Sequence, residues 1–123
     1  MTRTLMIVDD DWAFRITLQE ILKQEGWDVV SAEDGAQAIQ IVTESRIDLI
    51  FMDIHLAGTN GIDTHAEIKE ISPDCVVVMM TGYSREALVE QALSQGALAV
   101  LQKPVQIERL MEIANNVAYA LSS

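Results

Sequence analysis

Residues that could bind a cation or a phosphoryl group stand at the ends of several short apolar runs. They are Asp9, Asp10 and Asp11 after the first run, Asp53 after the third, Thr81 after the fourth and Lys103 after the fifth. Each position alone has an ordinary explanation, such as a helix cap, a strand-end hydroxyl or a turn. Their shared placement after successive runs indicates a common site.

The chemistry of such a site follows from its side chains. Carboxylates from two loops would repel one another unless a cation lay among them, and oxygen ligands of this kind suit Mg²⁺. A carboxylate such as Asp53 can attack a phosphoryl group to form an acyl phosphate. Thr81 and Lys103 would then bind the phosphoryl oxygens. The residues therefore predict Mg²⁺-dependent phosphoryl transfer.

The elements that must position these residues alternate along the chain. Short apolar runs are followed by stretches of helical period, which is typical of a parallel sheet with helices on both faces. The expected strands are residues 5–8, 28–31, 49–52, 75–80 and 97–101. In a doubly wound sheet, ligands bind at the carboxyl ends of the strands. We therefore expect the chemical residues to meet at that edge.

Five helices are expected between and after the strands. Asp34 can cap the second helix, and Pro73 limits the third. Gly26 and Gly96 can end the first and fourth. The last, from Ile107 to Leu121, has apolar residues at steps of three and four. The pattern predicts an α/β fold with a doubly wound five-stranded parallel sheet.

Composition limits the function further. The 123 residues fit one domain over residues 1–123, and the net charge of −11 disfavours direct binding to nucleic acid. The apolar runs are too short to cross a membrane, and no signal-peptide core is visible, so we expect a cytoplasmic protein. Cys75 is the only cysteine and is expected to be a buried, inert thiol.

At this point the sequence resembles a known family, the receiver domains of two-component response regulators. The resemblance covers essentially the whole chain. Its motifs are Ile7-Val8-Asp9-Asp10-Asp11, Asp53-Ile54-His55-Leu56 with Asn60-Gly61, Met80-Thr81-Gly82, and Lys103-Pro104. It implies a flavodoxin-like sheet with strand order 2-1-3-4-5.

The resemblance also implies roles for individual residues. Asp53 would be the phosphoacceptor, and a histidine kinase or histidine phosphotransfer protein would be the donor. Asp10, Asp53 and the main-chain carbonyl of His55 would ligate Mg²⁺, with Asp9 binding through water. Thr81 and Lys103 would contact the phosphoryl group. The protein would be a signalling phosphoacceptor and not an enzyme, catalysing only its own phosphorylation and dephosphorylation.

The resemblance also bears on how phosphorylation would be transmitted to a partner and on how long the acyl phosphate would persist. The resemblance implies an output face formed by helix 4, strand 5 and helix 5, which also allows a homodimer. Val100 stands where the family usually has an aromatic switch residue, and Ala57 where it often has proline. His55 and Tyr83 flank the expected phosphoryl position, and we hypothesise that they shield the acyl phosphate from water.

Two other functions compete with this interpretation. A haloacid dehalogenase-type phosphatase also uses an aspartyl nucleophile, but it has a second Asp where this chain has His55. A pseudo-receiver, an interaction module independent of phosphate, would accommodate Ala57 and Val100.

His65 lacks a second His or Cys at metal spacing and is interpreted as a solvated residue. The sequence does not specify the cognate kinase, the pathway, an attached output domain or the oligomeric state.

Overall fold

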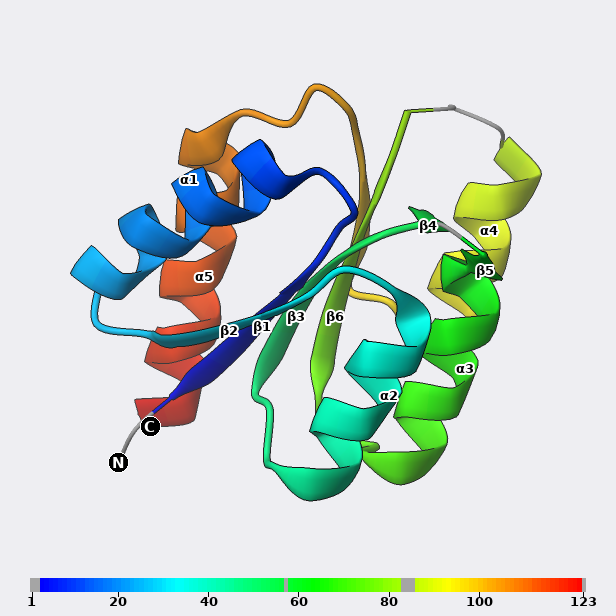
Figure 1. Cartoon of the computed structure of the whole chain (residues 1–123), viewed down its shortest axis with the longest axis horizontal. Coiled ribbons are helices and arrows are strands. Elements are labelled where there is room, and N and C mark those ends of the chain that lie inside the picture. Colours follow the sequence, from blue (N-terminus) through cyan, green and yellow to red (C-terminus); the bar gives the residue numbers. More distant parts are fainter. Residues whose placement is uncertain (1–2, 57, 83–85, 123) are drawn as a thin grey trace.

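The chain forms a five-stranded parallel sheet in the order β2-β1-β3-β6-β7 (Figure 1). The computed structural model describes residues 3–56, 58–82 and 86–122. The sheet strands are β1 (Thr4–Val8), β2 (Asp28–Ala32), β3 (Leu49–Asp53), β6 (Val76–Thr81) and β7 (Ala99–Gln102). This is the predicted order 2-1-3-4-5, because β6 and β7 are the fourth and fifth strands of the sheet.

Five helices connect and follow these strands. They are α1 (Trp12–Gln24), α2 (Gly35–Glu44), α3 (Gly61–Ile71), α4 (Glu86–Ser94) and α5 (Ile107–Ser122). As predicted, the Asp34 carboxylate caps α2 by accepting from the Gln37 main-chain N–H at 2.8 Å. Gly26 and Gly96 follow α1 and α4 with φ of 95° and 99°, the left-handed backbone that favours glycine.

The predicted strand boundaries lie within one residue of the observed ones, except at the start of the last sheet strand. The last sheet strand begins at Ala99 and not at residue 97, since Leu98 is exposed and lies in the turn before it. A two-stranded antiparallel hairpin, β4 (His55–Leu56) and β5 (Thr59–Asn60), follows the third sheet strand and was not predicted. Strands of two residues are too short to show an alternating pattern.

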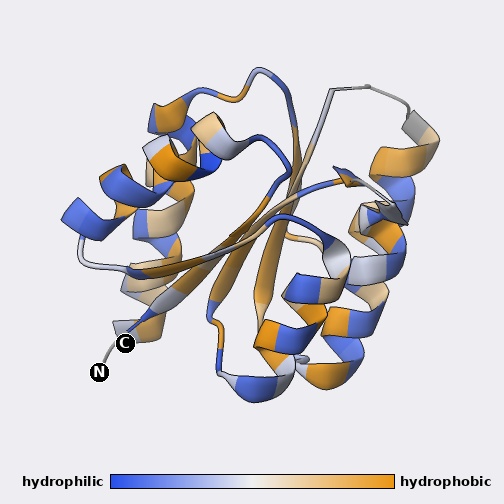
Figure 2. Cartoon of the chain, in the orientation of Figure 1, coloured by the Kyte–Doolittle hydropathy of each residue, from blue (hydrophilic) through white to orange (hydrophobic). Residues whose placement is uncertain are grey.

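Two hydrophobic cores lie on opposite faces of the sheet. Helices α1 and α5 cover one face, and α2, α3 and α4 cover the other (Figure 1). Residues of one strand alternate between these cores: Phe51 packs on the α1–α5 side and Ile50 on the other side. The strands are therefore almost continuously apolar in Figure 2. Across the described residues, no helix is long and apolar enough to span a membrane.

Two further sequence interpretations can now be compared with the fold. Cys75 is 1% exposed, which confirms a buried thiol, and burial raises the pKa of that thiol to about 12. The interpretation of His65 as a solvated residue is wrong, because its side chain is fully buried in α3. The helical period placed His65 on α3, but it could not show that the packing of α3 against the rest of the fold buries this side chain.

Candidate functional site

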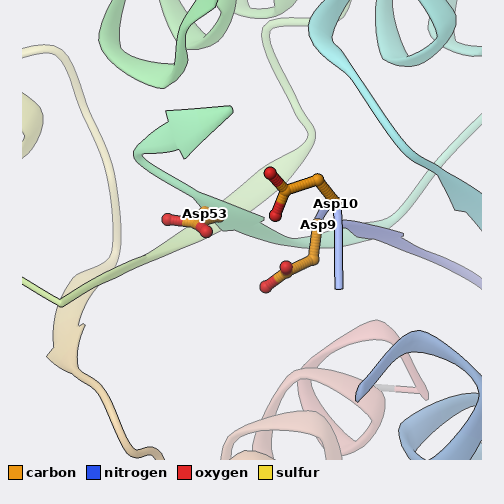
Figure 3. Close-up of side chains that lie close together, drawn as sticks. All are labelled: Asp9, Asp10 and Asp53. Carbon is orange, nitrogen blue, oxygen red and sulfur yellow. The ribbon is translucent and has the colours of Figure 1, made fainter. Parts of the chain in front are cut away.

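Three aspartates converge at the carboxyl ends of β1 and β3 (Figure 3). Asp9, Asp10 and Asp53 each offer a carboxylate oxygen, and these oxygens lie within 4.8 Å of one another. Asp9 and Asp53 are buried, whereas Asp10 is exposed. Like charges at this separation repel strongly when they are shielded from water. The cluster therefore needs compensating positive charge.

Lys103 supplies part of that charge from the loop after β7. Its Nζ donates to Asp9 Oδ2 at 2.8 Å and to Asp53 Oδ2 at 2.9 Å. Partial burial lowers the pKa of Lys103, but the hydrogen bonds and charges of the two aspartates outweigh burial and raise it above the usual value. The lysine is therefore a cation at neutral pH. Three carboxylates with one ammonium still leave an excess of negative charge.

Local hydrogen bonds hold Asp9 at the end of β1. Its Oδ1 accepts from the Asp11 main-chain N–H at 2.9 Å, and its main-chain oxygen accepts from Arg15 Nη1 at 2.7 Å. Asp11 in turn caps α1 by accepting from the Phe14 main-chain N–H at 3.2 Å. The first turn of α1 thus fixes one wall of the acidic cluster. The three consecutive aspartates therefore differ in role, because Asp9 and Asp10 belong to the acidic cluster and Asp11 caps α1.

Asp53 is the last residue of β3 and is 6% exposed. Its Oδ1 accepts from the His55 main-chain N–H at 3.0 Å. The following loop is held against α3, because the Gly61 main-chain N–H donates to the Ile54 oxygen at 2.7 Å. A Cβ at Gly61 would lie 2.6 Å from the Asp53 main-chain oxygen. Only glycine permits this close approach of helix and acceptor loop.

Thr81 ends β6 on the same edge of the sheet and is 1% exposed. Its main-chain oxygen accepts from the Lys103 main-chain N–H at 2.7 Å. This bond ties the loop that carries Lys103 to the end of the neighbouring strand. The structure therefore brings together Asp9, Asp10, Asp53, Thr81 and Lys103, as the sequence predicted. Ala57 and Tyr83 lie outside the described residues.

Arg15 and Gly61 contribute to the site but were not identified as site residues from the sequence. Arg15 follows Asp11 by about one helical turn, so its spacing in the sequence could have placed it near the acidic motif. Gly61 belongs to the Asn60-Gly61 part of the receiver motif. Its role depends on the distance between α3 and the end of β3, which no local pattern reveals.

The donor set fits a hard divalent cation. Asp9, Asp10 and Asp53 offer only oxygen ligands, and their net charge exceeds the charge that Lys103 supplies. Mg²⁺ and Ca²⁺ both prefer such oxygens, and Mg²⁺ commonly uses one or two carboxylates together with phosphate oxygens and water. The exposure of Asp10 leaves room for water at the outer side of the cluster.

Comparison with known proteins identifies the family. The family model described as "Response regulator receiver domain" matches residues 5–115. The chain belongs to this receiver domain family. Receiver domains are signalling phosphoacceptors that are phosphorylated by histidine kinases or phosphotransfer proteins. They are generally not classed as enzymes.

Individual relatives agree with this assignment. The chain is 33% identical to sporulation initiation phosphotransferase F of Bacillus subtilis over 91% of this chain and 90% of the relative. It superimposes on a CheY-like receiver domain protein from Methanospirillum hungatei with a TM-score of 0.91 and 27% identity, covering 97% and 96% of the two chains.

Two other solved structures are relevant to the chemistry of receiver domains. A response regulator from Burkholderia pseudomallei contains a phosphorylated aspartic acid and a calcium ion. It matches with a TM-score of 0.85 and 26% identity over 98% of this chain and 71% of that one. The beryllofluoride-activated NtrC4 receiver domain, a dimer, matches with a TM-score of 0.86 and 28% identity over 93% and 94% of the chains.

Proposed function

We propose that this receiver domain is a signalling switch in a two-component phosphorelay and that Asp53 accepts the phosphoryl group. The observation that carries the proposal is the pairing of Lys103 Nζ with the buried carboxylates of Asp53 and Asp9, at 2.9 and 2.8 Å, beside the exposed Asp10. This arrangement combines a nucleophilic carboxylate with a cation for the incoming phosphoryl oxygens. The donor is a phosphohistidine of a histidine kinase or phosphotransfer protein, and the location is cytoplasmic.

Transfer of the phosphoryl group to Asp53 is a displacement at phosphorus. A carboxylate oxygen of Asp53 forms a bond to phosphorus while the bond between phosphorus and the donor imidazole nitrogen breaks. The electron pair of that bond stays on the imidazole, and Asp53 becomes an acyl phosphate. Dephosphorylation transfers the phosphoryl group to water and restores the carboxylate. Both reactions occur on the domain itself, without turnover of an external substrate.

Mg²⁺ is the cofactor that we assign to the acidic cluster. Asp10, Asp53 and the main-chain carbonyl of His55 would ligate the ion, and Asp9 would bind through water. When bound, Mg²⁺ would neutralise the carboxylates and the phosphoryl oxygens. The excess negative charge of the cluster supports this assignment. Asp9 is held by Lys103 and by the Asp11 main-chain N–H, which favours an indirect role.

Thr81 and Lys103 connect the phosphoryl group to the rest of the domain. Both stand at strand ends, and the main-chain hydrogen bond from Lys103 to Thr81 joins their loops. Attraction of their side chains to phosphoryl oxygens would draw these loops inward. The loops precede α4 and α5, so we propose that phosphorylation changes the face formed by α4, β7 and α5. A homodimer through this face is one form of output.

Val100 changes how that output is transmitted. It lies in β7 and packs against the core on the side of α2, α3 and α4. A valine has no ring that could rotate between buried and exposed positions. We therefore propose that movement of the α4 backbone, and not rotation of a side chain at position 100, transmits phosphorylation.

The homodimer is tested by sedimentation of the protein with and without beryllofluoride, with Asp53→Asn as the unactivated control.

His55 and Tyr83 remain our candidates for controlling the lifetime of the acyl phosphate. His55 is exposed two residues beyond Asp53, where its side chain could limit the access of water. We expect the His55→Ala and Tyr83→Ala variants to lose the phosphoryl group faster than the unsubstituted protein. Unchanged decay rates in both variants would remove this role.

The decisive experiment is intact-mass analysis after incubation with acetyl phosphate, with and without Mg²⁺. We expect one phosphoryl adduct on the unsubstituted protein, dependent on Mg²⁺, and none on Asp53→Asn. Peptide mapping should place the adduct on Asp53. An unsubstituted protein that accepts no phosphoryl group and also binds no beryllofluoride would instead be a pseudo-receiver. Catalytic hydrolysis of a phosphomonoester would support the phosphatase alternative.

A further inference from the structure

The Lys103 ammonium has a third neighbour besides the two aspartates. The ring of Phe14 lies with its centroid 5.7 Å from Lys103 Nζ. An ammonium within about 6 Å of an aromatic ring is attracted by the negative face of the ring. Phe14 is in the first turns of α1, whereas Lys103 follows β7, so this contact joins elements far apart in the sequence.

Hydrogen bonds and core packing hold Phe14 in place. Its main-chain N–H donates to the capping Asp11 carboxylate, and Arg15 beside it donates to the Asp9 main-chain oxygen. Its side chain is partly buried and packs against the core on the side of α1 and α5. One hollow in the surface is lined by Asp11, Phe14, Lys103, Pro104 and Val105. The hydrogen bonds at the start of α1 and the packing against the core therefore hold the ring beside the lysine.

Aromatic chemistry suits this position better than a third acidic group would. The Lys103 side chain is 29% exposed, so water competes for its ammonium. Another carboxylate would hold the ammonium but would add negative charge beside the incoming phosphoryl group. A ring attracts the cation without a formal charge and without accepting a strong hydrogen bond. The ammonium then keeps its N–H donors for carboxylate and phosphoryl oxygens.

We propose that Phe14 is a positioning residue for Lys103, which it holds through a cation–π contact in the orientation used for phosphoryl transfer. This inference rests on the proposed function, because it assigns Lys103 to the phosphoryl oxygens. Phe14 itself does not contact the reacting atoms. Its contribution is to limit the positions that the flexible lysine side chain can occupy.

The test compares phosphorylation rates by acetyl phosphate at several donor concentrations in the presence of Mg²⁺. Phe14→Leu keeps an apolar side chain but removes the ring, and we expect the maximal rate to fall about two- to fivefold. The half-saturating donor concentration should change little. Phe14→Tyr keeps the ring and should retain the rate. Equal rates for the unsubstituted protein and a folded Phe14→Leu variant would overturn the proposal.

Two controls separate positioning from general stability. Arg3 lies over the Trp27 ring at 5.6 Å, remote from the site, so Arg3→Gln removes a comparable cation–π pair and should leave the rate unchanged. In a Lys103→Met background, Phe14→Leu should cause no additional slowing. Additional slowing of the same size would show that Phe14 acts independently of Lys103 and would contradict the inference.

A spectroscopic measurement does not depend on phosphorylation. The Lys103 ε-methylene protons should show a ring-current shift in the NMR spectrum that Phe14→Leu removes and Phe14→Tyr retains. A Lys103 signal that is unaffected by Phe14→Leu would overturn the contact itself. If the contact is present but the unsubstituted protein accepts no phosphoryl group, the proposed function fails instead.

Discussion

At the scale of single residues, the site is an arrangement of unequal aspartates. Asp9 and Asp53 are buried and share the Lys103 ammonium, whereas Asp10 is exposed. Asp11, the next residue, caps α1 and lies outside the cluster. Burial and hydrogen-bond geometry, and not residue type, therefore assign different roles to four residues with the same side chain.

The repulsion within this cluster predicts the behaviour of Asp10→Asn. Without metal, the variant should melt a few degrees above the unsubstituted protein, because one of three neighbouring negative charges is removed. Mg²⁺ should also stabilise the variant less, since a ligand that binds the folded state stabilises it more the more tightly it binds. Differential scanning calorimetry with EDTA and with Mg²⁺ measures both effects.

Asp74→Asn is the matched control for this charge change. Asp74 is exposed in the turn after α3 and lies outside the cluster. We expect it to leave the stabilisation by Mg²⁺ unchanged. A metal-free Asp10→Asn protein that melts at or below the temperature of the unsubstituted protein would argue against repulsion as the dominant effect in the site.

At the scale of elements, α3 and the acceptor loop are joined by contacts that leave no room for a side chain. Gly61 begins α3 against the main chain of Asp53 and Ile54. Farther along this helix, His65 is fully buried, and neither ring nitrogen has a hydrogen-bond partner within the described part of the chain. One end of α3 is thus tightly fitted, and its middle contains an imperfectly satisfied polar group.

Gly61→Ala should disturb the first of these contacts. Its Cβ would lie within 2.8 Å of three main-chain atoms of the acceptor loop, so the backbone must move. We expect a loss of about 1–3 kcal/mol in the free energy of unfolding, measured by urea denaturation. Gly82→Ala is the control, because a Cβ there meets no atom of the described residues within 4 Å. Equal effects of the two substitutions would show that backbone entropy, and not crowding, dominates.

His65 should make stability depend on pH. Burial lowers the pKa of its ring below 6.5; the nearby Gln95 side chain opposes this shift, and the charge of Lys69 adds to it. The unfolded chain therefore binds a proton near pH 6.5, whereas the folded chain does so only at lower pH. Stability should fall as the pH decreases below 6.5 and stop falling once the folded ring is also protonated.

His65→Leu should reduce this slope and should raise stability at pH 6 by about 1 kcal/mol, because it also removes unpartnered polar atoms from the core. Urea denaturation at several pH values in metal-free buffer measures the change. His55→Gln is the control that removes the chain's other histidine, and the slope should persist in it. A slope that survives His65→Leu would have to arise from other titrating groups.

At the scale of the whole molecule, the sheet separates two cores while holding the site at one edge. Strand residues alternate between the two cores, so the strands contribute to both. The acidic residues and Lys103 lie at the carboxyl ends of the strands. Ile54 and Leu56 after Asp53 belong to the core on the side of α2, α3 and α4, so the acceptor loop is part of that core.

Substitutions in the two cores should therefore be independent. Ile68→Val lies on the side of α3, and Ile113→Val lies on the side of α5. Each should cost about 0.5–1.5 kcal/mol, and the double variant should equal their sum within about 0.5 kcal/mol. Denaturation followed by circular dichroism and by tryptophan fluorescence should show one common transition. Separate transitions would mean that the two cores unfold independently.

The sequence by itself determined the fold class and the identity of the converging residues. Both follow from local information: apolar runs produce strands covered on both faces, and parallel strands bring the residues after them to one edge. The strand order followed from the resemblance to receiver domains. The caps at Asp34 and Gly26 were predictable for the same reason, since each depends on its neighbours in the chain.

Only the tertiary structure decided how far each residue is buried and what it contacts across the fold. Burial of His65 depends on the packing around α3, and the need for glycine at position 61 depends on the end of β3. The ring of Phe14 lies beside Lys103, although most of the chain separates the two residues in sequence. These contacts join residues whose neighbours in sequence do not specify each other. The physical reason is that periodicity selects the face of an element, whereas packing between elements selects the partner.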